Sequence, residues 1–556
     1  MKLIECVPNF SEGRDRAVID AITGEIGRVE GAALLDVDPG AATNRTVVTL
    51  AGPPESVLEA AFRAIRRAAE LIDMSRHRGE HPRMGATDVC PFVPMQGATM
   101  RDCVELAERL AQRVGDELGI PVYLYGEAAR RPDRRRLPDI RQGEYEALPA
   151  KLRDPGFAPD FGPARFHARA GATAIGAREF LIAWNVNLNT RDRKIANLIA
   201  GELRETGKPR KDAAGKAVRG ADGEALRDPG RLRELQGGGW YIAEYGRAQI
   251  SLNLMNYKVT GMHTVFDGAC EEAEKIGARV TGSEVVGLVP LDALLAAGDH
   301  YLARLGRTTG VPETERIHAA VLSLGLSELA RFDPGQKVIE YRYRGAPSGL
   351  RALRLTEFVD ELSSDSPAPG GGSVAALCGS LSAALSSMVA ALTWTKKGLE
   401  SRRPAMGGLG RRAQILKDWF LEAVDRDARA FDAVLAARRL PARSDAERAV
   451  REAAVRAADL EATRVPLGVV ERAVEALELA LEAARDGNPA SISDAGVAGL
   501  CALAAAEGAA YNVRINLPAL GDDAEATGIR DELAQYLDRA HDRAAEVREV
   551  VERALA

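Results

Sequence analysis

The sequence predicts a multidomain protein in which two α/β subdomains of the α+β, ferredoxin-like type precede an all-α helical domain. Three observations predict it. The chain has 556 residues, which is too long for one hydrophobic core. Residues 1–332 alternate between runs typical of strands and runs typical of helices. From Leu353 onward strand patterns nearly vanish, and Ala, Leu, Arg and Glu recur at helical spacing.

The first subdomain is predicted to span residues 1–178 and to begin in the order β-α-β-β-α-β, that of a split βαβ layer. No GxGxxG string joins a strand to a helix, which disfavours a dinucleotide-binding domain. The expected strands are residues 3–10, 32–37, 46–51, 89–93 and 122–125, and the expected helices are residues 16–29, 54–72 and 100–118.

A second α/β subdomain is predicted over residues 179–332, with strands at residues 249–254 and 258–264. Residues 206–231 are charged and poor in apolar side chains, so we expect an exposed insertion there. Pro and Gly cluster in residues 333–349, which predicts a linker. The helical domain then covers residues 350–556.

Composition disfavours several classes of protein. A net charge of −6 gives no support for a nucleic-acid surface. The six cysteines form no CxxC pair, which fits a reducing compartment and predicts no zinc site; Glu5 interrupts any signal peptide. The apolar residues 374–394 are dominated by Ala, Ser and Gly, which favours a buried helix over a membrane span. We therefore expect a cytoplasmic protein without a membrane, nucleic-acid or metal partner.

His81 is the first candidate catalytic residue. His77 and His81 form an H-x-x-E-H string, which in metalloproteases holds zinc from one helical face. Gly79 and Pro82 disfavour that helix, so we expect His81 to be extended and to act as a general acid and base instead. Its orienting partner is expected among the carboxylates Asp36, Asp38, Glu80 and Asp88. A surface histidine in a turn is the structural alternative.

Asp427 is the second candidate catalytic residue. An apolar stripe at helical spacing is expected at Leu421, Val424, Ala428, Phe431 and Leu435. Ala423, Ala430 and Val434 widen this stripe, and Asp427 falls within the widened arc, whereas Asp425 falls on a face that looks solvated. Burial would raise the pKa of Asp427 and make it a useful proton shuttle. A purely structural aspartate is the alternative.

A glycine run, Gly370, Gly371 and Gly372 followed by Ser373, precedes the first long helix of this domain. Its backbone N–H groups are candidates for holding an anionic or carbonyl group of a substrate. The alternative is a flexible entry turn in which Ser373 is the N-cap of the helix.

Several long strings in the chain resemble those of a known family. Residues 5–13, 35–38, 44–46, 79–85, 123–128 and 159–163 resemble glutamate formimidoyltransferase, as do residues 176–178, 238–241 and 263–265. Residues 368–376, 424–428, 465–467 and 511–517 resemble formimidoyltetrahydrofolate cyclodeaminase. Together they resemble the fused bifunctional formimidoyltransferase-cyclodeaminase over almost the whole chain. The charged insertion near residues 208–228 is the main departure from that pattern.

The resemblance implies a folate enzyme of histidine degradation with transferase and ammonia-lyase activities. Its first part would transfer the formimino group from N-formimino-L-glutamate to N5 of tetrahydrofolate. Its second part would cyclise the product to 5,10-methenyltetrahydrofolate and release ammonia. The implied co-substrate is tetrahydrofolate, polyglutamylated and without a metal, and the implied assembly is a homo-oligomer.

The resemblance also implies roles for particular residues. The family's catalytic histidine falls on His81, an assisting aspartate on Asp38 and the cyclodeaminase aspartate on Asp427. Asp38 precedes Pro39-Gly40, so a turn-capping role is the alternative. Asn9, Asn44 and Arg45 are candidate anchors for substrate carboxylates, or residues of turns and strand ends. The implied folate-binding stretch consists of Gly162, Pro163, Ala164, Arg165, Phe166, His167, Ala168, Arg169, Ala170 and Gly171.

Two other functions stay open at this point. In the first, only one of the two sites is active and the other half is a folate-holding or oligomerisation module. In the second, the protein is a non-catalytic folate-binding scaffold, which the joint presence of His81 and Asp427 disfavours.

Overall fold

The computed structural model describes residues 2–41, 43–79, 81–212, 216–220, 223, 225–345, 349–366, 368–521 and 524–556. Glu80 and parts of the expected linker and insertion therefore lie outside the described residues. The chain divides into two compact units, one formed by Met1–Ala297 with Val321–Gly345 and the other by Gly298–Ala320 with Ala346–Ala556.

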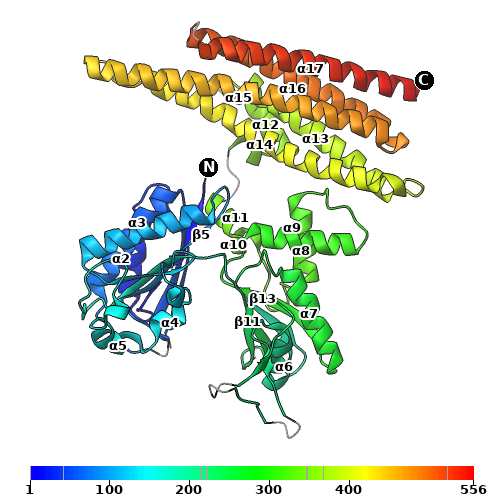
Figure 1. Cartoon of the computed structure of the whole chain (residues 1–556). Helices are drawn as coiled ribbons and strands as arrows, with labels where there is room; N and C mark the ends of the chain where they lie inside the picture. The colour runs from blue at the N-terminus through cyan, green and yellow to red at the C-terminus, as the bar shows by residue number, and fades with distance from the viewer. Residues whose placement is uncertain are drawn as a thin grey trace. The chain divides into compact units, whose positions relative to one another are not determined.

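The first unit begins with a mixed seven-stranded sheet (Figure 1). Its strands run in the order β1-β4-β2-β5-β7-β6, and β3 pairs with β4. Strands β5, β6 and β7 pair in parallel, and the other pairs are antiparallel. The strands are β1 (Ile4–Cys6), β2 (Asn9–Phe10), β3 (Ala33–Gly40), β4 (Arg45–Gly52), β5 (Thr87–Pro94), β6 (Val122–Gly126) and β7 (Thr173–Ala177).

The single strand expected at residues 3–10 is wrong, because it is divided into β1 and β2 on either side of Val7 and Pro8. Proline has no backbone N–H to donate to a neighbouring strand, so the ladder is interrupted there. The division places Asn9 at the start of a second short strand, beside β4 and β5.

Five helices accompany this sheet: α1 (Arg16–Gly27), α2 (Pro54–Leu71), α3 (Met100–Leu118), α4 (Leu137–Arg141) and α5 (Glu144–Lys151). Helices α1, α2 and α3 share one buried cluster with the sheet, in which Phe62 and Leu110 are fully or almost fully buried. Helices α4 and α5 contribute Ile140 and Leu148 to a second cluster with Tyr123. Thr99 and Asp102 form a reciprocal capping box that fixes the start of α3.

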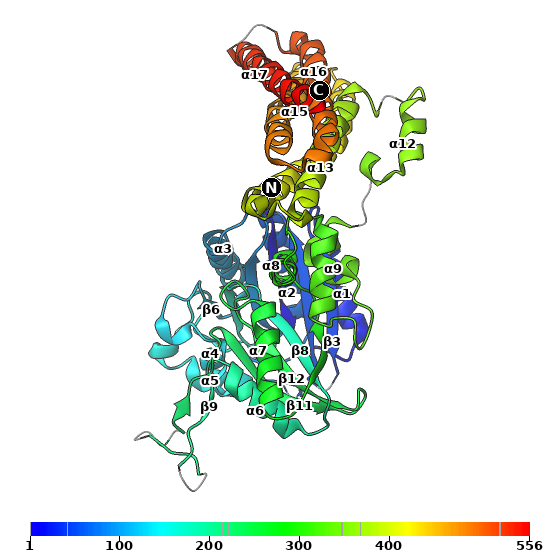
Figure 2. The same cartoon turned by 90° about the vertical axis from the view of Figure 1, so that its right-hand side faces the viewer.

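The second subdomain of this unit has a four-stranded antiparallel sheet in the order β11-β12-β8-β13. Helices α6 and α7 lie against it (Figure 2), and Trp184 of β8 stacks on Phe266 of α7 with ring centroids 6.1 Å apart. Its elements are β8 (Ile182–Leu188), α6 (Arg193–Leu203), β11 (Leu235–Ile242), β12 (Arg247–Leu254), α7 (Met262–Lys275) and β13 (Val280–Val286). Two short strands of the charged insertion, β9 (Lys208–Pro209) and β10 (Arg227–Asp228), pair with each other.

The strand expected at residues 258–264 is wrong. The side chain of Asn256 accepts a hydrogen bond from the backbone N–H of Lys258 at 3.0 Å, and its carbonyl accepts those of Val259 and Thr260. These bonds make a local turn of the kind that asparagine favours, and α7 begins directly afterwards at Met262. Four further helices follow β13: α8 (Leu291–Arg304), α9 (Glu313–Ser323), α10 (Pro334–Lys337) and α11 (Ile339–Arg344).

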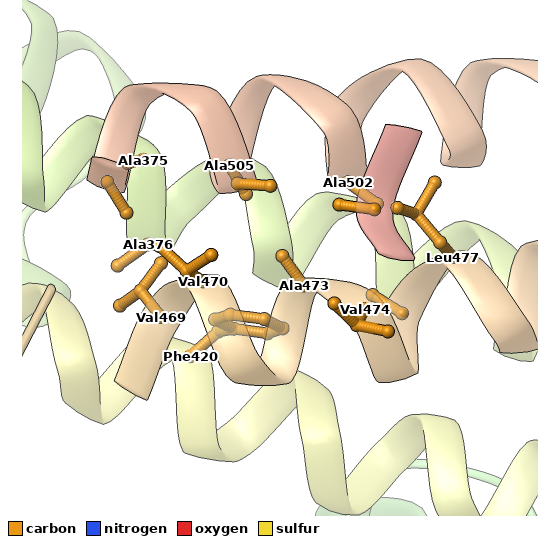
Figure 3. Close-up of a cluster of buried hydrophobic side chains, with 14 of the residues drawn as sticks. Ala375, Ala376, Phe420, Val469, Val470, Ala473, Val474, Leu477, Ala502 and Ala505 are labelled. Atoms are coloured by element: carbon orange, nitrogen blue, oxygen red, sulfur yellow. The ribbon is translucent and has the colours of Figure 1, made fainter. Parts of the chain in front are cut away.

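The second unit is dominated by long helices, as the composition predicts. They are α12 (Leu355–Leu362), α13 (Gly371–Thr395), α14 (Arg403–Arg438), α15 (Asp445–Asp486), α16 (Ile492–Asn516) and α17 (Ala524–Leu555). Figure 3 shows the core between α13, α14, α15 and α16, where Phe420 lies among Ala and Val side chains. The many small residues let the helix backbones approach closely, and this sets the spacing of the bundle.

Two helices of the described part of the chain are long and apolar enough to cross a membrane, Gly371–Thr395 and the stretch Pro489–Leu520. In the most apolar window of the first, the mean hydropathy is 1.7 and 56% of the residues are buried inside the protein. Ala376, Ala383 and Ser386 of α13 are fully buried against other helices. This burial favours a core helix of a bundle for Gly371–Thr395.

Candidate active sites

His81 lies in the segment between α2 and β5, and Nη1 of Arg45 is near both of its ring nitrogens, 3.1 Å from Nδ1 and closer to Nε2. Nδ1 is 2.7 Å from the carbonyl oxygen of Pro82, and a carbonyl can only accept, so Nδ1 carries the proton. Nε2 is then the basic nitrogen, and it accepts a hydrogen bond from Nη1 of Arg45. The structure therefore holds His81 as a neutral imidazole with the guanidinium of Arg45 against its ring nitrogens.

Burial and the charge of Arg45 both lower the pKa of His81 from its ordinary value of 6.5. Burial also lowers the pKa of Arg45 to about 10. Burial is the largest cause of both shifts, since removing a cation from water disfavours its charged form. His81 is thus a base that is free of its proton at neutral pH, as a group accepting a proton during a reaction must be.

Asp88 is the carboxylate that influences His81 most directly. It is 1% exposed, accepts the backbone N–H of Met84 at 2.9 Å, and is paired with the guanidinium of Arg141. Its charge acts to raise the pKa of His81, against the larger effects of burial and Arg45. Sequence reasoning named Asp88 only as one of four carboxylates and missed Arg141, because no string or spacing links residue 141 with His81.

Asp38 lies in β3, opposite Val47 of β4, and its side chain is exposed. Directly paired residues point to the same face of a sheet, and so do residues two apart on one strand. Asp38 is therefore on the same face as Arg45. No hydrogen bond or ion pair within the described part of the chain joins Asp38 to His81, so an orienting role for Asp38 stays a prediction.

Asn9 and Asn44, expected as substrate anchors, make hydrogen bonds within the protein. The amide of Asn9 donates to the carbonyl of Val7 at 2.8 Å. Asn44 accepts from the backbone of Gly13 and donates to the carbonyl of Arg78, each at 3.0 Å. His77 donates from Nε2 to the carbonyl of Asn44 at 2.8 Å. These bonds tie the start of β4, which carries Arg45, to the segment that carries His81.

The expected folate-binding stretch, residues 162–171, lies against the segment that follows His81. Ala170 accepts a hydrogen bond from the backbone of Ala86 at 2.8 Å, and Gly171 faces Gly85 in an antiparallel bridge. A Cβ atom on Gly171 would lie 2.1 Å from the carbonyl oxygen of Met84, so this contact requires glycine. These backbone contacts place residues 162–171 near the segment that contains His81.

Three side chains of this stretch have different surroundings. Arg165 is exposed. Nη2 of Arg169 donates to the carbonyl of Glu70 at 2.6 Å, and Nδ1 of His167 accepts from the backbone of Ala170 at 3.0 Å. Arg165 is therefore the side chain of the stretch that is most available to a ligand.

Asp427 lies on α14 beside the first turn of α13. Its Oδ2 accepts a hydrogen bond from the hydroxyl of Ser373 at 2.8 Å, and Ser373 is fully buried. Burial raises the pKa of Asp427, while the hydrogen bonds from the Ser373 side chain and backbone act to lower it. The carboxyl group is therefore one that can be protonated at a higher pH than an ordinary aspartate.

The glycine run leaves space for the carboxyl group of Asp427 at Gly372. Gly370 is the N-cap of α13 and the helix begins at Gly371, so the expectation of Ser373 as N-cap is wrong. A Cβ atom on Gly372 would lie 2.2 Å from Oδ1 of Asp427. Asn512 of α16 comes close to Gly371 and donates to the carbonyl of Gly508 at 2.8 Å. The first turn of α13 thus holds a carboxylate of the protein itself, as the helix N-terminus favours.

Two expectations for α14 are wrong. Asp425 is 5% exposed, and its carboxylate pairs with Nε of Arg351 at 3.1 Å, whereas we expected it to be solvated. Phe431, expected on the buried stripe, is 42% exposed. The buried face is centred on Ala423 and Ala430, and Asp425 is buried separately, because the segment at Arg351 covers its side of the helix.

We predict that His81 titrates below pH 6.5 and that Arg45→Met raises its pKa, because the substitution removes the neighbouring cation. NMR titration of the imidazole C–H signals measures both values. Arg101→Met is the control, since the Arg101 side chain is 88% exposed and pairs with Glu105 on α3. A His81 pKa at or above 6.5 in the unmodified protein would contradict the assigned neutral form.

Three family descriptions match successive parts of the chain. Residues 3–178 match the "Formiminotransferase domain, N-terminal subdomain", residues 183–344 match the "Formiminotransferase domain", and residues 354–535 match "Formiminotransferase-cyclodeaminase". The first two matches divide between the two sheet subdomains, and the third begins where the long-helix part of the chain begins.

Curated relatives agree with these matches. The chain is 45% identical over 547 residues to a protein of Sus scrofa named formimidoyltransferase-cyclodeaminase, which covers 98% of each chain. It is 41% identical over 301 residues, 54% of this chain and 93% of the relative, to a glutamate formimidoyltransferase of Streptococcus pyogenes. It is 39% identical over 186 residues, 34% of this chain and 89% of the relative, to a methenyltetrahydrofolate cyclohydrolase of Methylorubrum extorquens. The full-length similarity shows that this chain belongs to the formimidoyltransferase-cyclodeaminase family.

Proposed function

We propose that the chain transfers the formimino group of N-formimino-L-glutamate to tetrahydrofolate, then cyclises the product to 5,10-methenyltetrahydrofolate with release of ammonia. One observation carries this proposal. Each of the two units holds a partly buried proton-handling group, and removal from water moves the pKa of His81 down and that of Asp427 up. The formiminotransferase descriptions match residues of the first unit and the formiminotransferase-cyclodeaminase description matches the helical part, and relatives are named for the transferase and for the combined enzyme.

In the transfer step, N5 of tetrahydrofolate attacks the amidine carbon and loses a proton, while the glutamate nitrogen leaves and gains one. Nε2 of His81 accepts the first proton and returns it to the leaving nitrogen, a role worth about 10²–10⁴ in rate. Arg45 covers Nε2 in the free protein. A substrate carboxylate that pairs with Arg45 draws the guanidinium from the imidazole and frees the base.

Asp38 and residues 162–171 complete the proposed transferase site. Asp38 shares a sheet face with Arg45, and from there it supports the protonated form of His81 as the reaction proceeds. The stretch 162–171 is hydrogen-bonded to the backbone just after His81. Its exposed Arg165 is placed to meet a glutamate carboxylate of the folate.

In the cyclisation step, N10 of the folate attacks the formimino carbon attached to N5, and ammonia leaves. N10 loses a proton and the leaving nitrogen gains one, so a single acid that cycles between its two forms serves both events. Asp427 is that acid in our proposal. Its raised pKa keeps the protonated form within reach, and Ser373 holds the ionised form in position.

The assembly we propose is a homo-oligomer formed in part by an apolar face of α13 and α16. Leu381 and Leu392 of α13 are 49% and 44% exposed, and Leu500 and Ile515 of α16 are 58% and 75% exposed. The two helices are neighbours, since a Cβ on Gly508 would lie 3.3 Å from that of Ala375. A groove of about 270 Å³ between α16 and α17 extends this face. Contiguous apolar surface of this kind is typical of an interface between copies.

Two further features support the remaining expectations. The second subdomain follows the order β-α-β-β-α-β with sheet order β11-β12-β8-β13, which supports describing it as ferredoxin-like. The six cysteines are free thiols, which supports a reducing compartment such as the cytoplasm.

Hydrolysis of 5,10-methenyltetrahydrofolate is a second candidate activity for the helical unit. The relative from Methylorubrum extorquens, which matches 34% of the chain, is named methenyltetrahydrofolate cyclohydrolase. Supplying methenyltetrahydrofolate and following the decay of its absorbance distinguishes hydrolysis from cyclisation, because cyclisation consumes 5-formiminotetrahydrofolate and releases ammonia.

We predict that His81→Ala lowers formimino transfer by about 10²–10⁴ while cyclisation of supplied 5-formiminotetrahydrofolate continues. Asp427→Asn should do the reverse, because the amide cannot cycle a proton. Methenylfolate absorbance and ammonia release measure the two reactions separately. Loss of both reactions in a correctly folded His81→Ala protein would overturn the two-site proposal.

We predict that Gly372→Ala lowers cyclisation at least about tenfold and leaves transfer unchanged, because the new methyl group displaces the Asp427 carboxylate by more than a hydrogen bond tolerates. The same two assays measure it. Gly408→Ala on α14 is the matched control, since a Cβ there meets nothing within 4 Å. Equal effects of the two substitutions would contradict the proposed role of the α13 start.

We predict that the double variant Leu381→Glu/Leu500→Glu reduces the number of subunits, because it places charges within the apolar face. Size-exclusion chromatography with light scattering gives the mass. Leu305→Glu is the control, because Leu305 is 74% exposed and lies on neither α13 nor α16. An unchanged mass in a folded double variant would exclude this face as an interface.

A further inference from the structure

Arg141 is the last residue of α4, and Asp88 fixes the direction of its guanidinium. Nε of Arg141 donates to Oδ1 of Asp88 at 3.3 Å, and Nη2 donates to Oδ2. The Arg141 side chain is 13% exposed and that of Asp88 is 1% exposed. One edge of the guanidinium is therefore occupied by Asp88, and Nη1 has no partner among the described residues. Asp88 thus fixes the orientation of the Arg141 guanidinium, and Nη1 of Arg141 is available to donate to another acceptor.

A second guanidinium in the same region has no acid of its own. Arg45 contacts His81, and no ion pair between Arg45 and a carboxylate occurs within the described part of the chain. Its Nε is buried and has no hydrogen-bond acceptor. The charges of both Asp88 and Arg141 act on Arg45, which places the three groups close together.

The charges in this cluster do not balance. Two guanidinium groups, Arg45 and Arg141, share the single carboxylate of Asp88, and His81 is neutral. A buried cation without a partner is unfavourable, and the structure supplies no further acid among the residues described. The unbalanced charge and the unused N–H groups both call for an anion from outside the chain.

We propose that Arg141 is a second substrate anchor, which with Arg45 binds the two carboxylates of a dicarboxylate of glutamate length. This assignment rests on the proposed transferase function for the identity of the substrate. Arg45 touches the imidazole, so it takes the carboxylate next to the reacting nitrogen. Arg141 takes the distal carboxylate through the Nη1 side that Asp88 leaves unused.

The arrangement makes Arg141 a determinant of specificity. A monocarboxylate would satisfy Arg45 and leave Nη1 of Arg141 without an acceptor, whereas a dicarboxylate satisfies both. Lysine is a poor substitute at position 141, because one ammonium group cannot keep two bonds to Asp88 and present a third donor in a fixed direction. In this proposal, selection of a dicarboxylate depends on both guanidinium groups.

Calorimetric binding of glutarate and of butyrate to the full-length protein tests the proposal without any turnover. We expect the unmodified protein to bind glutarate more tightly than butyrate, and Arg141→Lys to reduce that preference at least about tenfold. The double variant Asp88→Asn/Arg141→Gln removes both charges of the buried pair and should have the same effect. Thermal unfolding shows whether each variant is folded. Arg135→Gln is the matched control, since Arg135 is 65% exposed and pairs with Glu127.

The outcomes separate this inference from the proposed function. If folded Arg141 variants keep the unmodified preference for glutarate, or if the unmodified protein has none, the role of Arg141 is overturned. If the preference depends on Arg141 but the unmodified protein does not transfer the formimino group, the anchor stands and the proposed function fails. In steady-state assays with N-formimino-L-glutamate, the proposal expects Arg141→Lys to raise KM more than it lowers kcat.

Discussion

Removal of ionisable groups from water is the physical constraint on which both candidate sites depend. Burial disfavours whichever form of a group is charged, so it acts in opposite directions on bases and acids. It lowers the pKa values of His81 and Arg45 and raises that of Asp427. Hydrogen bonds then position the protons at each site. The carbonyl of Pro82 holds the proton on Nδ1 of His81, and the hydroxyl of Ser373 donates to the carboxyl group of Asp427.

The two units remove their ionisable groups from water through different architectures. In the first, a mixed sheet places Arg45 at the start of a strand, and hydrogen bonds from Asn44 join that strand to the His81 segment. In the second, the first turn of one helix meets the middle of another, and Gly372 makes room for the Asp427 carboxylate. A helix start offers unpaired backbone N–H groups, which is why the beginning of α13 can lie beside a carboxylate.

The division into sheet subdomains and a helical domain could be predicted because periodicity is a property of neighbouring residues. Local turn chemistry was harder to predict: Pro8 divides a strand, and Asn256 makes a turn where apolar residues indicated a strand. The location of Asp427 near the buried face of α14 could be predicted from helical spacing and from residues 424–428, which resemble the family. Asp425 could not, because its partner Arg351 lies on another segment. The pair of Asp88 and Arg141 is equally non-local, and common charged residues carry no signal of such a contact.

The burial of Asp427 has a thermodynamic consequence for the protein that carries it. Below the ordinary aspartate pKa of about 3.8, the folded and unfolded chains both hold its proton, and the group has no effect on folding free energy. As pH rises above that value, the unfolded chain releases the proton while the folded chain retains it. The unfolded state is therefore stabilised relative to the folded state. This loss of stability grows until the raised folded-state pKa is passed and then stays constant. At neutral pH the helical unit therefore folds in spite of Asp427, and its alanine-rich core supplies the excess stability that lets the residue remain there.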